Sequence, residues 1–216
     1  MSSICIYPND PTTLFLEPIC KALEVTGQCT ILRPEIQANY NDIIQIIKDS
    51  EDGTLIIFLG HGTTFSLNDS NQNPIICNED FYIFKHKRLF FLSCRSREFI
   101  SANETTPIQE YIGFGNMLTD WDEIFQERNN DANAYPNITK EIILQYRELL
   151  TKAICADIKD LIISGKDMKY FYIQLRMRLN RSISELLLNK EKGYLETAYM
   201  LDETKKEIKL VFSKGN

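Results

Sequence analysis

The sequence predicts an α/β protein with three layers, in which helices flank a mostly parallel sheet and C-terminal helices precede a terminal β-hairpin. Over the first 118 residues, short β-type runs alternate with stretches of helical periodicity, the pattern of parallel strands joined by crossover helices. Two of these runs, Leu55–Leu59 and Leu89–Leu92, are apolar at every position. Strands that are covered by helices on both faces have this composition.

The elements of the first half follow from this alternation. Polar residues at Thr63–Asn73 predict a loop. Glycines at 113 and 115 interrupt the last β-type run, which suggests that another backbone, such as that of a bound ligand strand, approaches it closely. Helical spacing is expected over 14–26 and 39–50, and strands are expected at 4–7, 29–32, 54–59, 89–92 and 111–117.

The second half reads as mostly helical. After an asparagine-rich loop at 126–137, apolar residues from Ile142 to Ile154 form one helical stripe, and Asp167 caps a further helix that ends by Gly193. Residues 197–201 and 207–212 predict the hairpin. We expect one domain over 1–216, with a core at 1–125, a helical part at 138–190 and the hairpin at 197–212.

Composition excludes several classes of function. The net charge is −6 and the 24 basic residues are dispersed, which argues against a nucleic-acid partner. No apolar run approaches the roughly 20 residues of a membrane span, and the first residues lack the basic region of a signal peptide, so we expect a cytoplasmic protein with no membrane partner. Six cysteines without a C-x-x-C pair and only two histidines predict no metal site and no cofactor.

A histidine and a cysteine follow the two wholly apolar strands. His61 stands in Gly60-His61-Gly62 after the first of them, and Cys94 follows the second. In sheets of this kind, functional side chains gather at the carboxyl ends of the strands, and we expect these two consecutive buried strands to be neighbours. The two side chains are therefore expected to meet.

This pairing predicts thiol catalysis. A free thiol has a pKa near 8.5, so the Cys94 nucleophile needs an adjacent base, and His61 would supply it before protonating the leaving amine. The N–H groups of Gly62 and Cys94 would stabilise the tetrahedral oxyanion. These residues predict a cysteine-type hydrolase.

An apolar strand ending in His-Gly, followed by another ending in a small residue and Cys94, resembles the caspase-like (clan CD) cysteine peptidases. Residues 111–115, followed by Asp120 and Trp121, are similar in particular to the prokaryotic CHAT branch. The resemblance implies a caspase-like fold and a cysteine endopeptidase that cleaves a protein substrate with a Cys-His dyad. It also implies a regulated effector in a stress, cell-death or antiphage module, with an activating or regulatory protein partner.

The same resemblance implies roles for substrate-binding residues. Substrate would lie antiparallel along Gly113–Met117, in contact with Gly115, Asn116 and Met117. The loop at Asn9 and Asp10 would help to form the S1 pocket, where Asp10 would favour a basic P1 side chain. Asp120 belongs to an acidic cluster that either starts a helix or shapes the substrate pocket.

Other features separate this chain from neighbouring classes. His61 precedes Cys94 by 33 residues, compared with about 50 in caspases, and Ser93 and Leu92 depart from the caspase and metacaspase patterns respectively. A phosphatase Cys-x5-Arg loop would need arginine at Ile100. The alternative that stays open is a catalytically inactive interaction module of the same fold, with Lys140–Lys190 as its docking surface.

Overall fold

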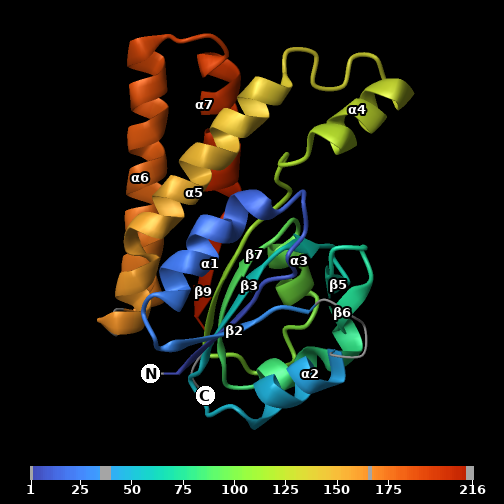
Figure 1. The fold of residues 1–216 in the computed structure, drawn as a ribbon, viewed down its shortest axis with the longest axis vertical. Coiled ribbons are helices and arrows are strands. Elements are labelled where there is room, and N and C mark those ends of the chain that lie inside the picture. Colours follow the sequence, from blue (N-terminus) through green and yellow to red (C-terminus); the bar gives the residue numbers. More distant parts are fainter. Residues whose placement is uncertain (1, 35–39, 165–166, 213–216) are drawn as a thin grey trace.

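The structure is a computed structural model that describes residues 2–34, 40–164 and 167–212. Its centre is a six-stranded sheet of order β2-β1-β3-β7-β8-β9, in which the first five strands are parallel and β9 is antiparallel to β8 (Figure 1). This confirms the predicted α/β class with a mostly parallel sheet. The strands are β1 (Ser3–Ile6), β2 (Cys29–Leu32), β3 (Leu55–Leu59), β7 (Arg88–Leu92), β8 (Glu110–Gly113) and β9 (Lys209–Phe212).

Alternate side chains of the central strands enter two separate cores, because successive residues of a strand point to opposite faces. Ile57 and Phe90 belong to one core and Phe58 and Phe91 to the other, all fully buried. The first core is closed by α1 (Glu17–Glu24), α5 (Lys140–Ile163), α6 (Met168–Asn189) and α7 (Tyr194–Glu207); the second is closed by α2 (Tyr40–Asp49), η3 (Asn78–Phe84) and α3 (Ser96–Ser101). Helices on both faces explain why these strands are apolar throughout.

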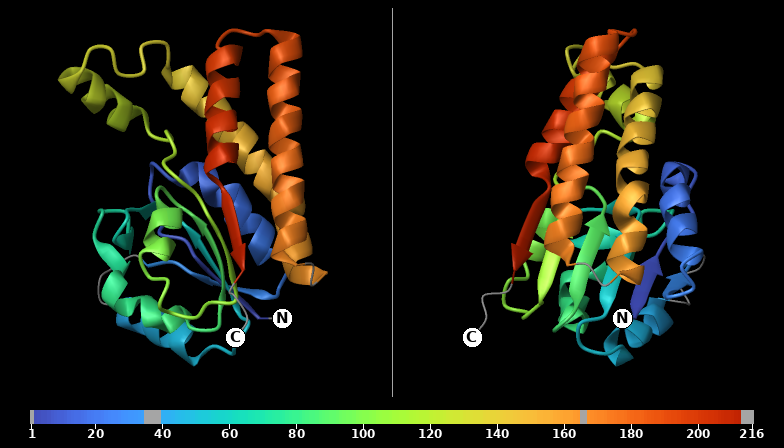
Figure 2. Two further views of the ribbon diagram at one scale, coloured as in Figure 1. Left: turned by 180° about the vertical axis from the view of Figure 1, so that it is seen from behind. Right: turned by 90° about the vertical axis from the view of Figure 1, so that its left-hand side faces the viewer.

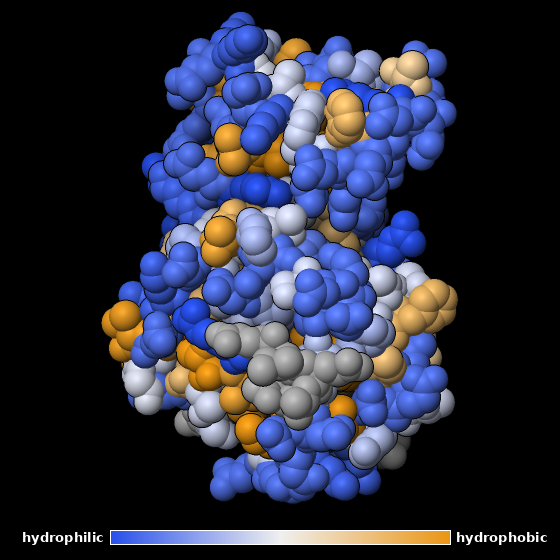
Figure 3. All heavy atoms as spheres, turned by 45° about the vertical axis from the view of Figure 1, so that its right-hand side comes forward, coloured by the Kyte–Doolittle hydropathy of each residue, from blue (hydrophilic) through white to orange (hydrophobic). Residues whose placement is uncertain are grey.

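The long helices α5, α6 and α7 pack beside one another and extend beyond the sheet (Figure 2). Asp167 caps α6 as predicted, since its Oδ1 accepts a hydrogen bond from the Tyr170 N–H at 2.6 Å. The 3-10 turn η1 (Leu14–Leu16) leads into α1, which packs against α5. None of the helices in the described ranges has the length and apolarity that crossing a membrane requires. Figure 3 shows a mostly hydrophilic face of the molecule. In this view the molecule is narrower between the long helices above and the sheet below.

The predicted terminal hairpin is wrong: residues 197–201 lie within helix α7, and only Lys209–Phe212 form a strand, which pairs with β8. Thr197, Leu201 and Thr204 are at most 3% exposed and recur at helical spacing. The Thr204 hydroxyl lies 2.6 Å from the hydroxyl of Tyr146 on α5. Packing of this face against α5 and α6 therefore outweighs the β-type composition of the segment.

The loop predicted at Thr63–Asn73 is also wrong in part, because it contains a strand of a second, antiparallel sheet. That sheet consists of β4 (His61–Gly62), β5 (Ser66–Asn68) and β6 (Pro74–Cys77). The Asp69 Oδ1 accepts hydrogen bonds from the N–H groups of Asn71 and Asn73, at 2.8 and 2.7 Å, and this closes the turn between β5 and β6. Such side-chain bonds are a frequent reason why polar segments form tight turns.

The asparagine-rich loop predicted at 126–137 begins later than expected, since α4 extends over Trp121–Asn130. Asp120 caps this helix through its Oδ1, which accepts from the Asp122 N–H at 3.0 Å, so the acidic cluster does start a helix. Arg128 holds the loop that follows, because its guanidinium donates to the carbonyls of Ala134 and Ile138, at 3.1 and 2.6 Å, and to that of Tyr135.

Candidate active site

The ends of β3 and β7 bring His61 and Cys94 to the same edge of the sheet. The two strands are direct neighbours, with Leu59 opposite Leu92, and the Gly60 N–H donates to the Leu92 carbonyl at 3.3 Å. His61 and Cys94 line one shared pocket at this edge. The adjacency expected of the two buried strands is confirmed.

His61 is held by the loop that follows β1, the strand on the other side of β3. Its Nε2 lies 2.7 Å from the Thr12 hydroxyl oxygen and 3.6 Å from Asp10 Oδ2. The Thr12 hydroxyl donates to Asp10 Oδ1 at 2.6 Å, so towards His61 it can only accept. Nε2 therefore carries the ring proton, and Nδ1 is the basic nitrogen of the neutral imidazole.

Asp10 is almost fully buried, with only 4% of its surface exposed. Its Oδ1 accepts from both the N–H and the hydroxyl of Thr12, and its backbone carbonyl accepts from the Thr13 N–H at 3.0 Å. A carboxylate held this way fixes the orientation of Thr12 and, through it, of His61. Asp10 therefore lies beside the imidazole, and its Oδ1 and its backbone carbonyl are already engaged as hydrogen-bond acceptors.

Gly62 allows the two strand ends to approach each other closely. A β-carbon at this position would lie 2.6 Å from Ser93 Oγ and 3.0 Å from the Cys94 carbonyl oxygen. These distances leave no room for a side chain. Glycine at 62 is therefore required for the backbone of His61-Gly62 to lie against that of Ser93-Cys94, which is where the predicted oxyanion donors are located.

Cys94 stands at the turn from β7 into α3. The next residue, Arg95, has a φ of 55°, in the left-handed region, and its N–H donates to the Gly115 carbonyl at 2.9 Å. A non-glycine residue in this conformation is uncommon and costs about 1–3 kcal/mol when strained, and such residues cluster at functional sites. The turn leaves the Cys94 side chain half-buried at the edge of the sheet.

The resting thiol does not form an ion pair with the imidazole. Cys94 Sγ donates to the Met117 carbonyl at 3.3 Å. Burial raises the pKa of this thiol to about 11, the hydrogen bond to Met117 and the charge of Arg95 act in the lowering direction, and the charge of Glu123 adds to the increase. At neutral pH the sulfur is therefore a protonated thiol, which would have to lose its proton to act as a nucleophile.

The predicted substrate strand is only partly available. Gly113 is paired with Lys209 of β9 and with β7, so no ligand strand can lie beside it. The groups that approach the glycines belong to the chain itself: the backbone of Arg97 lies against Gly113, and the side chain of Glu207 lies against Gly115. The expectation of a ligand backbone at Gly113 is therefore wrong.

Beyond Gly113, the predicted contacts differ in accessibility. Asn116 is exposed, Met117 is 5% exposed and lines the pocket shared with Cys94, and the Gly115 carbonyl accepts from Arg95. Asp120 is half-buried and caps α4. The roles of Gly115, Asn116, Met117 and Asp120 in substrate binding stay predictions.

Sequence reasoning missed Thr12, the residue that contacts His61 directly. A signal was present, because Thr12 follows the end of β1 and parallel strands end at one edge of a sheet. It also missed Phe15 and Leu150, which line the pocket from η1 and α5. No sequence motif marks a helix residue such as Leu150 as a pocket wall.

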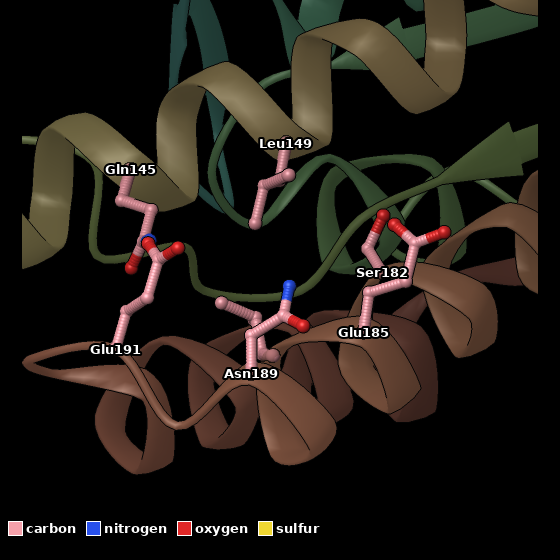
Figure 4. A pocket seen from close by; sticks show the side chains of 7 residues that line it. Gln145, Leu149, Ser182, Glu185, Asn189 and Glu191 are labelled. Carbon is pink, nitrogen blue, oxygen red and sulfur yellow. The ribbon is translucent and has the colours of Figure 1, made fainter.

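A second cavity lies between α5 and α6, away from this edge. Figure 4 shows Gln145 and Leu149 of α5 facing Ser182, Glu185 and Asn189 of α6, with Glu191 just beyond that helix. None of the residues predicted for the site lines it.

Together the fold and the site define a class: α/β proteins that present a cysteine and an oriented histidine at the carboxyl edge of a mostly parallel sheet. No protein-family model, no curated protein and no solved structure shows a significant match to this chain.

Proposed function

We propose that this protein is a caspase-like cysteine endopeptidase, akin to the prokaryotic CHAT branch, that hydrolyses peptide bonds of a protein substrate. One observation carries the proposal: Cys94 and His61 follow adjacent parallel strands and line one pocket, and the histidine is oriented from behind by Thr12 and Asp10. A nucleophile, a base and a group that orients the base are the parts that thiol catalysis needs.

The first half of the reaction follows from the tautomer of His61. Cys94 Sγ attacks the carbonyl carbon of the substrate, a C–S bond forms, and the thiol proton moves to His61 Nδ1. The carbonyl oxygen takes up the electron pair and becomes an oxyanion near the Gly62 and Cys94 N–H groups. When the C–N bond breaks, the imidazolium gives its proton to the leaving amine.

In the second half, water hydrolyses the thioester. His61 Nδ1 takes a proton from the water, the new C–O bond forms, and the C–S bond breaks as the proton returns to the sulfur. Throughout, the positive imidazolium is stabilised by Thr12 and by the negative charge of Asp10, 3.6 Å from Nε2. Asp10 therefore acts as a positioning residue in this mechanism.

The resting hydrogen bond of Cys94 supports a regulated enzyme. For attack, Sγ must leave the Met117 carbonyl and turn towards His61. An activating protein partner that shifts the segment around Met117 would promote this change. Such control suits an effector of a stress, cell-death or antiphage module, in which constant proteolysis would damage the cell.

A peptide probe with a thiol-reactive group, such as an acyloxymethyl ketone, tests the proposal. We expect covalent labelling of Cys94, located by mass spectrometry, that disappears in Cys94→Ala and falls at least about a hundredfold in His61→Ala. Cys155→Ala is the matched control, since Cys155 is another half-buried cysteine outside the site. Labelling that spreads over other cysteines and ignores His61 would contradict the proposal.

A second candidate is a catalytically inactive interaction module of the same fold. The raised pKa of Cys94 favours it, because burial keeps the sulfur protonated, and the resting Sγ bonds to the Met117 carbonyl instead of the imidazole. Its docking surface would be the helical part, where Met177 and Leu188 of α6 are 58% and 81% exposed. The probe separates the two candidates, since a module has no reason to couple Cys94 labelling to His61.

A further inference from the structure

The pocket that His61 and Cys94 share has mostly apolar walls. Half of its lining residues are large apolar side chains contributed by η1, the end of β7, the segment after β8, and α5. They are Phe15, Leu16, Leu92, Met117 and Leu150. Thr13 and Thr119 contribute the only hydroxyl groups of the described lining.

The electrostatics of the pocket disfavour a cationic guest. Among its described lining residues no carboxylate is present. Of the carboxylates nearby, Asp10 is buried with its Oδ1 bonded to Thr12 and its Oδ2 facing His61, and Glu123, whose charge acts on Cys94 and His61, lies outside the lining and interacts with Arg147. Arg147 stands against the wall of the pocket: its guanidinium lies 4.9 Å from the ring centroid of Phe15 and its Nε donates to the Thr119 carbonyl. A lysine or arginine side chain would therefore meet mainly apolar groups, with no carboxylate of the lining to pair with.

The pocket also disfavours an anionic side chain, because it offers few hydrogen-bond donors. The Thr13 hydroxyl donates to the Asp10 carbonyl at 3.3 Å, which engages one of the two hydroxyl donors of the lining. The guanidinium of Arg147 lies behind Phe15 and Thr119 rather than among the lining residues. A buried carboxylate without strong donors is costly.

The pocket is also small. It is more enclosed than the cavity between α5 and α6, and the free space at its centre holds about one water-sized group. A methyl or hydroxymethyl group fits such a space, whereas a branched or long side chain does not.

We infer that this pocket is the S1 subsite and that it selects a small uncharged P1 residue, namely glycine, alanine or serine. The inference rests on the proposed peptidase function and replaces the expectation, based on Asp10, of a basic P1 residue. Phe15 and Leu150 form the steric limit, and the apolar walls exclude charge.

The test is a set of acyloxymethyl ketone probes that share Ala-Ala at P3 and P2 and differ only at P1, which is glycine, alanine, serine, leucine, aspartate or lysine. Labelling rates at Cys94 are measured by mass spectrometry on the full chain. We expect glycine, alanine and serine to exceed leucine, aspartate and lysine by at least about tenfold. Faster labelling by the lysine or aspartate probe overturns the inference and leaves the peptidase proposal intact, whereas no labelling of Cys94 by any probe overturns the peptidase proposal itself.

Two variants with opposite effects on the size of the pocket test whether the pocket sets the P1 preference. Phe15→Ala enlarges it and is expected to raise the leucine-to-alanine ratio at least about tenfold. Thr119→Leu fills it and is expected to leave glycine as the only good probe; it also keeps the test decisive if Phe15→Ala fails to fold. The matched control is Phe65→Ala, because Phe65 is 69% exposed and does not line the pocket. Unchanged ratios in both variants would contradict the assignment.

Discussion

The Nε2 atom of His61 lies 2.7 Å from the hydroxyl oxygen of Thr12. This contact decides which ring nitrogen would act as the base towards Cys94 in the proposed reaction. Because the Thr12 hydroxyl donates its own proton to Asp10, it accepts from Nε2, and Nδ1 is left with the lone pair that a general base needs. The loop after β1 thus sets the chemistry of a histidine that follows β3.

This relationship predicts that Thr12→Val lowers the rate of Cys94 labelling by a peptide probe by about ten- to a hundredfold, because the tautomer and the ring orientation are no longer fixed. Thr12→Ser keeps a hydroxyl and is the matched control, with labelling close to that of the unchanged protein. The rates are measured with saturating probe, together with thermal unfolding to show that both variants are folded. Equal labelling of the two variants would contradict the positioning role of Thr12.

A second prediction concerns the pH dependence of the resting thiol. Burial raises the pKa of Cys94 to about 11, which favours the neutral thiol, so the thiolate fraction is on the order of 10⁻⁴ at pH 7 and grows about tenfold per pH unit until that pKa is reached. Alkylation of Cys94 by iodoacetamide, followed by mass spectrometry between pH 7 and 10, should follow this slope.

Two comparisons make this measurement decisive. Free cysteine, with a pKa near 8.5, should level off above pH 9. His61→Ala should leave alkylation by the small reagent nearly unchanged, because the resting thiol bonds to Met117 and not to the imidazole. A plateau below pH 8, lost in His61→Ala, would show instead that a thiolate-imidazolium pair exists before substrate binds.

The central sheet could be predicted because its signals are local and strong. Wholly apolar runs such as Leu55–Leu59 need helices on both faces, and the order of strands and helices then limits the connections. The C-terminal segment could not be predicted in this way. Residues Thr197–Leu201 include types that suit a strand, and the segment is helical because it packs against α5 and α6. The strand β9 completes the sheet from a distant part of the chain.

The candidate site divides in the same way. That His61 and Cys94 lie at one edge of the sheet could be predicted, because each follows a strand that the sequence marks clearly. The walls of the pocket could not be predicted, because Phe15 and Leu150 reach the pocket through tertiary packing that leaves no short-range pattern in the sequence. Asp10 was found, but in the structure its burial and its bonds to Thr12 favour the positioning of His61 over contact with a basic side chain.

A third prediction concerns Ser93. Its hydroxyl oxygen is buried and has no hydrogen-bond partner among the described residues. Leaving such a group unsatisfied costs about 1–3 kcal/mol, so Ser93→Ala should leave the free energy of unfolding unchanged or raise it by about 1 kcal/mol in urea denaturation. A loss of more than about 1 kcal/mol would mean that the hydroxyl has a bonding partner, such as a buried water.

A fourth prediction concerns Gly62. In Gly62→Ala the new β-carbon would lie 2.6 Å from Ser93 Oγ, so we expect a loss of about 1–3 kcal/mol of stability and a displaced His61. Labelling of Cys94 by the alanine probe should fall steeply. Gly27→Ala is the control for lost stability without a steric overlap: its φ of +62° strains an alanine, but no atom lies within 4 Å of the added β-carbon, so labelling of Cys94 should stay normal. Normal labelling by Gly62→Ala would show that the close approach of the two strand ends is not needed.

The last prediction separates the helix α7 from the hairpin that the sequence suggested. In a strand, Thr197, Tyr199 and Leu201 would share one face, whereas in the helix Leu201 is buried and Tyr199 is 63% exposed. Leu201→Ala should therefore cost about 2–5 kcal/mol in the free energy of unfolding, and Tyr199→Ala should change it by less than about 0.5 kcal/mol. Urea denaturation followed by circular dichroism measures both. Similar losses at the two positions would argue for the strand, and with it for a different edge beside β8, because β9 reaches the sheet directly from the end of α7.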